Sequence, residues 1–291
     1  YDKKQADAAI AHWEASVQQD PGQALVHRNL AIARYNKQGD ADAALREMEQ
    51  ARRLDPGYPR LLLEYDQLAA RLGRSNAARL QLLEENLALV EQRDDLMLRY
   101  VTLLNCEGRC EEALQILLTR RFHPWEGGEG KVSAQYRYAL IRLAKDCLNR
   151  GENDRAVQLL EQSKTYPDTL GEGKLPNVPD NEADYWQGVA LRAMGREPEA
   201  AAAFLRAASG PQEPGRVLYY NDQPSDFIYY QGLAQRAMGN EAAARKAFHK
   251  LLTYGETHLF DAVAYDFFAV SLPEIEVFAD DIALRNRQYC N

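Results

Sequence analysis

Apolar positions recur along the chain at the spacing of amphipathic helices, and the pattern itself repeats late in the sequence. The segment 185–195 reads YWQGVALRAMG, and the segment 229–239, which begins 44 residues later, reads YYQGLAQRAMG. The agreement extends into the following helix, where each copy has an alanine and, four positions on, a phenylalanine: Ala200 and Phe204, then Ala244 and Phe248. This pattern predicts a helix, a glycine turn and a second helix.

The two glycines of each copy predict different features of this unit. Gly188 and Gly232 lie inside the first helix, where glycine costs about 1 kcal/mol relative to alanine. We therefore expect the second helix to approach closely at these positions. Gly195 and Gly239 follow the last turn of the first helix, where a residue with positive φ ends a helix at little cost.

The same glycine-to-alanine spacing recurs earlier in the chain, for example at Gly39 with Ala44 and at Gly151 with Ala156. These copies predict an all-α solenoid of about six to seven helix pairs after an N-terminal half-repeat over residues 2–19. The first helices of the pairs are expected near 25–38, 58–72, 94–107, 132–150, 181–194 and 225–238.

The two ends of the chain have their own predictions. A final helix pair is expected near 256–271 and 274–287, with the last helix capping the array through a thin apolar face that includes Ile275, Phe278 and Ile282. At the other end, a half-repeat would leave an apolar face uncovered. We therefore expect the chain to be a fragment of a longer protein, forming one solenoid over 1–291.

The segment 35–56, YNKQGDADAALREMEQARRLDP, resembles a tetratricopeptide repeat almost residue for residue. The resemblance implies a right-handed α-α superhelix whose first helices line a concave surface. Two departures are visible. Leu30 and Tyr35 are one residue further apart than in the family pattern, which predicts an offset or bulge in that helix. The late repeat of 44 residues also exceeds the family's period of about 34.

Composition and charge narrow the classes of partner. The chain has 35 Lys and Arg against 43 Asp and Glu, a net charge of −8 spread along its length. Without a basic stripe to neutralise phosphates, nucleic acid is not an expected partner. No apolar stretch approaches the roughly 18 residues of a membrane span. The four cysteines read as reduced thiols, so we expect a cytoplasmic protein.

The sequence carries no catalytic or metal-binding pattern. The five histidines are scattered, and no nucleophile–base–acid order or metal-binding helix motif is present. Cys106 and Cys110 flank a predicted turn, but no second Cys or His pair follows at ligand spacing, as a tetrahedral site requires. The sequence predicts no enzyme activity, no metal and no cofactor.

An insertion over 120–136, RRFHPWEGGEGKVSAQY, does not fit the generic repeat. It resembles a segment of the C-terminal tetratricopeptide arrays of certain large bacterial proteins. In those proteins a β-rich domain of unknown function, with a carbohydrate-enzyme-like fold, precedes the array. The resemblance implies a bacterial, cytoplasmic protein with a link to sugar metabolism.

The glycines of this insertion do not form a phosphate-binding loop. That motif needs a glycine where Trp125 stands and a Ser or Thr where Val132 stands. Two interpretations stay open. In one, Pro124 and Trp125 anchor the loop against neighbouring helices and Lys131 begins the next helix. In the other, the loop is a recognition surface for a sugar or a peptide. Its candidate residues are His123, Trp125, Glu126, Glu129 and Lys131.

A second candidate site lies on the two repeated first helices. Tyr185 and Arg192 are seven residues apart on one helix, and Tyr229 and Arg236 repeat the pair on the other. Seven residues are two helical turns, so each pair shares one stripe. If the stripe faces the groove, the pairs offer stacking and carboxylate recognition. In the alternative, the tyrosines pack between repeats and the arginines are solvated.

Together these features predict a non-enzymatic protein-interaction or scaffolding module. Its concave groove would bind a protein or peptide, or another domain of its parent chain. The alternative, from a different class, is an accessory carbohydrate-binding domain of a sugar-active bacterial enzyme that touches its ligand through Trp125.

Overall fold

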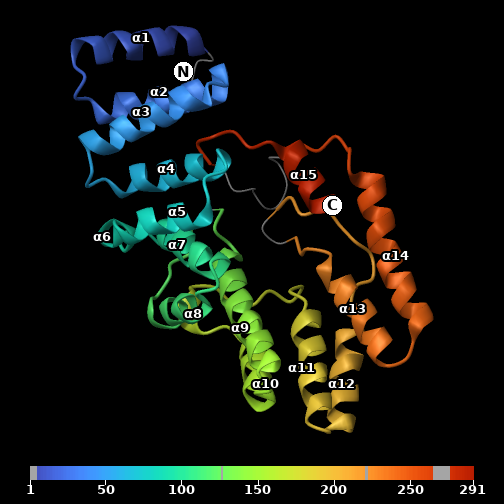
Figure 1. Cartoon of the computed structure of the whole chain (residues 1–291). Coiled ribbons are helices and arrows are strands. Elements are labelled where there is room, and N and C mark those ends of the chain that lie inside the picture. Colours follow the sequence, from blue (N-terminus) through green and yellow to red (C-terminus); the bar gives the residue numbers. More distant parts are fainter. Residues whose placement is uncertain (1–4, 126, 220–221, 265–275) are drawn as a thin grey trace. The chain divides into compact units, whose positions relative to one another are not determined.

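The computed structural model describes residues 5–125, 127–219, 222–264 and 276–291, and within these ranges all regular secondary structure is helical. The predicted fold class, an all-α solenoid of tetratricopeptide-like helix pairs, is confirmed. The chain forms two compact units, shown in Figure 1 and described separately below. Unit 1 comprises residues 1–107 with 275–280, and unit 2 comprises residues 108–274 with 281–291.

Unit 1 is a stack of short helices in which each packs against the next along the chain (Figure 1). Its elements are α1 (Ala6–Gln19), α2 (Ala24–Ala33), the π-helical turn η1 (Arg34–Gln38), α3 (Ala41–Leu54), α4 (Pro59–Arg71), α5 (Asn76–Glu84), α6 (Leu87–Val90) and α7 (Asp94–Cys106). Its main core cluster contains the fully buried Ala31, Ala44, Met48, Ala51, Leu61 and Leu68.

The turn η1 confirms the predicted bulge in the first complete repeat. A π-helical turn holds one more residue than an α-helical turn, which accommodates the extra residue between Leu30 and Tyr35. Leu30 can then be buried beneath α1 while Tyr35 packs against the cluster around Met48. Asn36, the next residue, lies in the same turn, and Gly39 ends it with a φ of 66°.

Unit 2 contains the helix pairs α9 with α10, α11 with α12 and α13 with α14. Its elements are α8 (Cys110–Thr119), α9 (Lys131–Asn149), α10 (Asn153–Gln162), the 3-10 turn η2 (Asp168–Leu170), α11 (Asn181–Ala193), α12 (Glu197–Ala207), α13 (Asp226–Ala237), α14 (Glu241–His258) and α15 (Ile282–Cys290). All six predicted first helices are confirmed, with ends within two residues of the prediction when η1 is counted with α2.

The repeated glycines act as predicted. A Cβ atom built on Gly188 would lie less than 3.0 Å from the ring of Phe204, and one on Gly232 equally close to the ring of Phe248. Gly195 and Gly239 have φ values of 73° and 85° and end α11 and α13. Each first helix therefore presents bare backbone to an aromatic ring of its partner helix.

The predicted final helix pair is wrong where the structure describes it. The first helix was expected over 256–271, but α14 already ends at His258 and residues 261–264 are irregular, while 265–271 lie outside the described residues. The second helix was expected over 274–287, but residues 276–281 are not helical and α15 begins at Ile282. Two contacts explain the difference: Asp281 caps α15 by accepting from the Leu284 N–H at 2.8 Å, and Phe278 packs into the core of unit 1.

Candidate functional site

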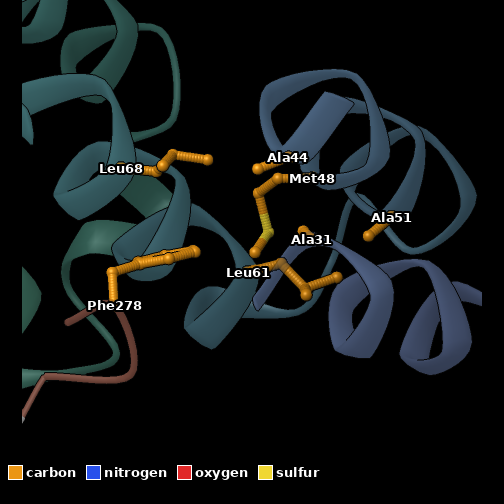
Figure 2. Packing of buried hydrophobic residues seen from close by; sticks show 7 residues of the cluster. All are labelled: Ala31, Ala44, Met48, Ala51, Leu61, Leu68 and Phe278. Carbon is orange, nitrogen blue, oxygen red and sulfur yellow. The ribbon is translucent and has the colours of Figure 1, made fainter. Parts of the chain in front are cut away.

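The non-helical segment 276–280 of unit 1, called the docked segment below, packs on the helices of that unit through one aromatic side chain. The Phe278 side chain is 1% exposed and belongs to the core cluster of Met48, Leu61 and Leu68. Figure 2 shows its ring extending from the segment toward this cluster. Tyr35 meets the ring edge to face, with centroids 5.5 Å apart and planes at 81°. Burial of a phenylalanine contributes about 1.5–3 kcal/mol, and an aromatic pair of this geometry about 0.5–1.5 kcal/mol more.

The backbone of the docked segment is held by the side-chain amide of Asn36. Its Nδ2 donates to the Val277 carbonyl at 2.7 Å, and its Oδ1 accepts from the Ala279 N–H at 2.7 Å. The two backbone groups flank Phe278, so Asn36 binds the main chain on both sides of this residue and contacts no side chain through these bonds. This pair of hydrogen bonds fixes the register that places Phe278 over the cluster.

Arginines of unit 1 hold the two acidic ends of the docked segment. Arg71 on α4 contacts Glu276 at 2.6 Å and Asp280 at 3.2 Å, and Arg99 on α7 lies 3.7 Å from Glu276. Burial by itself lowers the pKa of Arg71, but the carboxylates of Glu276 and Asp280 outweigh it and the pKa is raised. The charged form of Arg71 is thus stabilised by the docked segment.

A buried carboxylate behind these arginines fixes their positions. Asp66 on α4 is 0% exposed and accepts from Arg79 at 2.8 Å and from Arg99 at 2.7 Å. Among the side chains joined by these ion pairs, unit 1 supplies three guanidinium groups and one carboxylate. The docked segment supplies the two further carboxylates that balance them. We call the surface formed by Tyr35, Asn36, Arg71, Arg99 and the core cluster the binding face.

The arginines predicted as a groove ladder in unit 2 make most of their contacts within their own repeats, although Arg192 also donates to the Ala237 carbonyl of the next repeat at 3.0 Å. The Arg192 guanidinium carbon lies 4.5 Å from the centroid of the Phe204 ring, and that of Arg236 lies 5.0 Å from Phe248. Arg192 also pairs with Glu197 at 3.6 Å, and the equivalent pair of Arg236 is with Glu241 at 3.3 Å. Each arginine thus covers the aromatic ring that packs on the glycine of its own first helix.

The predicted tyrosines lie around the same rings. The ring of Tyr185 is 6.0 Å from that of Phe204, and burial raises the pKa of this half-buried tyrosine. The ring of Tyr229 is 5.6 Å from that of Phe248, and 47% of the residue is exposed. The structure therefore brings each predicted Tyr/Arg pair together, around a phenylalanine of the second helix. Recognition of a partner by Tyr185, Arg192, Tyr229 and Arg236 stays a prediction.

A polar network on the first helices of unit 2 was missed by sequence reasoning. Glu182 on α11 accepts from Tyr230 of α13 at 2.5 Å and pairs with Lys145 of α9 at 3.3 Å. Lys145 also lies 5.0 Å from the centroid of the Trp186 ring. Burial, followed by the Glu182 carboxylate, raises the pKa of Tyr230. One signal was available: Trp186 and Tyr230 occupy the same position of the two repeats, and both are aromatic.

The insertion loop of unit 2 agrees with the anchoring interpretation in two respects. Lys131 begins α9, as predicted, and Glu172 caps that helix by accepting from the Gly130 N–H at 2.7 Å and the Ser133 N–H at 3.0 Å. Trp125 is half-buried, and its ring lies where a side chain on Gly128 would otherwise stand.

The remaining loop candidates differ in exposure. His123 is exposed, Glu129 and Lys131 are half-buried, and Glu126 lies outside the described residues. Lys131 lines a cavity of about 260 Å³ with Arg216 and Arg285, and Arg216 is paired with Asp261. Sugar or peptide recognition by this loop stays a prediction.

Two further observations concern chemistry and membranes. In the part of the chain that the structure describes, no group of three or more His, Cys, Asp and Glu residues is arranged to hold a metal ion. Cys106 is exposed and Cys110 is buried. No helix within the described ranges has the length and apolar character that a membrane crossing requires.

The chain is an α-helical repeat protein, because its helices are paired and glycine turns end the first helices. Residues 226–254, which cover α13 and most of α14, match the tetratricopeptide repeat family. This is the second of the two copies recognised from the sequence pattern.

Solved structures resemble the chain at low sequence identity. A tetratricopeptide repeat protein from Parabacteroides merdae is 13% identical with a TM-score of 0.46, over 99% of this chain and 93% of that one. A chain of the APC/C hetero-tetramer Cut9-Hcn1 is 11% identical with a TM-score of 0.44; the match covers 98% of this chain but spans only 46% of that one. YrrB, described as a TPR protein with an unusual peptide-binding site, is 16% identical with a TM-score of 0.35, over 82% of this chain and 89% of that one.

Proposed function

We propose that this chain is a non-enzymatic protein-interaction module in which unit 1 binds an extended polypeptide segment. The segment belongs to another protein or to the parent chain. The observation that carries the proposal is the docked segment itself, which the helices of unit 1 hold through Asn36, Arg71 and the core cluster around Met48 and Leu61. These are the contacts by which a helical groove would hold a peptide from outside.

The contacts divide into a general and a specific part. The two bonds from Asn36 go to backbone groups that every residue other than proline carries, so they favour any extended segment. The ring of Phe278 and the ion pairs of Arg71 depend on side chains and select among segments. A surface with both properties suits the recognition of a peptide segment.

The carbohydrate-binding alternative has less support. It relies on Trp125, whose ring is half-buried and packed over Gly128. One side of the ring is therefore already occupied within the loop. Sugar binding stays a prediction.

A selection experiment tests the proposed function without assuming a ligand sequence. Random short peptides would be selected on the full chain carrying Phe278→Ala, which loosens the docked segment. Selected peptides would be measured again on the chain carrying both Phe278→Ala and Asn36→Ala. Loss of two hydrogen bonds of about 0.5–1.5 kcal/mol each should weaken binding about 5- to 150-fold.

Two controls make the selection decisive. Asn149→Ala, a substitution at the end of α9 in unit 2, should leave the affinity of the selected peptides unchanged. Circular dichroism should show that all variants keep their helical content. Failure to select any peptide, or peptides that bind equally well without Asn36, would overturn the proposal.

A further inference from the structure

We infer that the external partner of unit 1 carries an acidic–X–aromatic–X–acidic segment, and that residues 276–280 of the chain compete with it for the binding face. This inference rests on the proposed function and adds the chemistry of the partner and an autoinhibitory contact. It is argued from the docked segment, which has this pattern as Glu276, Phe278 and Asp280.

The contacts of the docked segment, which bends at residues 277 and 278, explain the pattern. Glu276 and Asp280 both reach Arg71, and Phe278 between them enters the core cluster. Ala279 is exposed and contributes its N–H to Asn36, while Val277 contributes its carbonyl and packs only partly against the cluster. The specific positions are therefore the first, third and fifth.

Charge sets the ends of the pattern. With the docked segment removed, Arg71, Arg79 and Arg99 would face a single carboxylate, that of Asp66. Partly buried guanidinium groups are costly without partners. A partner with two carboxylates at this spacing restores the balance, and one with lysines there adds repulsion. The same argument excludes a basic or uncharged peptide as the preferred ligand.

The docked segment is placed in the chain like a ligand delivered from elsewhere. Residues 281–291, which follow it, belong to unit 2, whereas the segment itself belongs to unit 1. Asn36 and Val277, which hydrogen-bond, are 241 positions apart. The segment is therefore joined to the helices of unit 1 by contacts and not by neighbouring sequence.

Tethering determines how strongly the chain's own segment competes. A covalently attached segment has an effective concentration on the order of millimolar, so a free peptide of the same sequence with micromolar affinity is outcompeted about 10- to 1000-fold. Weakening the docked segment by mutation removes this competitor. The affinity of a free peptide should then rise by that factor.

Fluorescence anisotropy with a labelled peptide of sequence EIEVFADDI, residues 274–282, tests both parts of the inference. The peptide should bind the Phe278→Ala chain at least about 10-fold more tightly than the unmutated chain. A second chain, carrying Glu276→Lys and Asp280→Lys, releases the segment by charge and leaves the phenylalanine in place. This second chain should also bind the labelled peptide more tightly than the unmutated chain. It serves as a control in case the Phe278→Ala chain misfolds.

Peptide variants test the pattern on the released chains. Alanine at the peptide position of Phe278, or lysine at the positions of Glu276 and Asp280, should lower the affinity of the peptide at least about 10-fold. A change of the exposed alanine to serine should have no effect, and a scrambled peptide should not bind.

The outcomes separate this inference from the proposed function. Equal affinity for the unmutated and released chains would overturn the autoinhibitory contact. Peptide variants that bind as well as the original would overturn the acidic–aromatic pattern. Either result leaves the proposed function in place if selected peptides still depend on Asn36. If neither the labelled peptide nor any selected peptide binds, the proposed function fails as well.

Discussion

Arginines on first helices behave differently in the two units. In unit 2, Arg192 and Arg236 each cover the phenylalanine of their own helix pair and meet a glutamate a few residues further on. In unit 1, Arg71 and Arg99 reach acidic side chains of a segment that is remote in sequence. The first arrangement is repeated with the repeat, and the second is not. The contacts that recur with the repeat are therefore packing contacts, whereas the contacts of the docked segment do not recur.

The largest expected effect concerns two phenylalanines that are buried to the same extent, one in each unit. Phe204 and Phe278 are each 1% exposed. Phe204→Ala should cost about 3–5 kcal/mol, because its helix cannot leave and a cavity remains. Phe278→Ala should cost unit 1 less, about 1.5–3 kcal/mol, since the docked segment can detach instead. Hydrogen exchange of α12 amides and of η1 and α4 amides would measure the two local opening free energies. Equal costs would contradict the view that only one ring belongs to a detachable element.

A glycine substitution sharpens the packing half of the comparison. Gly188→Ala should destabilise α11 and α12 by about 1–3 kcal/mol, because a Cβ atom there overlaps the Phe204 ring and outweighs the better helix propensity of alanine. Gly173→Ala is a matched change in unit 2 with no atom within 4 Å of the added Cβ. Urea unfolding should show a lower midpoint for the first variant and no loss for the second. A stable Gly188→Ala chain would show that the close approach is not needed.

Neutralising one arginine in each unit tests whether arginine holds the docked segment of unit 1. Arg71→Met should release the docked segment at a cost of about 1–2 kcal/mol, because it removes two charge-assisted contacts in a partly buried site. Arg192→Met should cost about 0.5–1 kcal/mol, the value of an exposed cation–π contact. Protease susceptibility of residues 276–280 is the readout. Cleavage should increase for Arg71→Met alone, and an increase in both variants would remove the distinction.

Alkaline pH should weaken unit 2 more than unit 1, which is the smallest of the expected effects. Among the tyrosines that the structure describes, burial raises the pKa of five in unit 2 and of one, Tyr65, in unit 1; the five are Tyr136, Tyr166, Tyr185, Tyr230 and Tyr254. Because the pKa of each tyrosine is higher in the folded than in the unfolded state, its contribution to the free energy of unfolding is complete below about pH 10. That contribution is lost as the pH rises above this value.

Tyr230→Phe provides the matched control for the alkaline effect. It removes one titrating group and should reduce the pH-dependent loss of stability of unit 2 by less than about 1.4 kcal/mol per pH unit. Helix-resolved hydrogen exchange between pH 9 and 11, corrected for intrinsic rates, would measure it. A steeper loss in unit 1 than in unit 2 would contradict the assignment.

Local sequence features predicted most of the helices and their turns. Gly188 and Gly195 were sufficient to locate a close helix contact and a helix end, because each depends on backbone sterics within one repeat. The additional residue between Leu30 and Tyr35 predicted the π-helical turn for the same reason. Short-range rules therefore succeed where the determining contact lies in the same helix pair.

The docked segment could not be predicted in this way. Its sequence is compatible with an amphipathic helix, and the spacing of Ile275, Phe278 and Ile282 favoured that interpretation. The competing contacts of Phe278 and Glu276 come from residues more than 170 positions away, such as Arg99, and leave no local pattern. The predicted Tyr/Arg ladder shows the same limit, since nothing in the residue types tells Arg192 from Arg71.

The central claim, that the helices of unit 1 hold residues 276–280 through Asn36, Arg71 and the core cluster, is tested most directly by hydrogen exchange at one amide. Ala279 is exposed, and its N–H has one acceptor in the structure, the Asn36 side chain at 2.7 Å. The account predicts slow exchange of this amide in the unmutated chain and fast exchange after Asn36→Ala, with α4 amides unchanged. Exchange of the Ala279 amide at the rate of an unfolded peptide in the unmutated chain would contradict it.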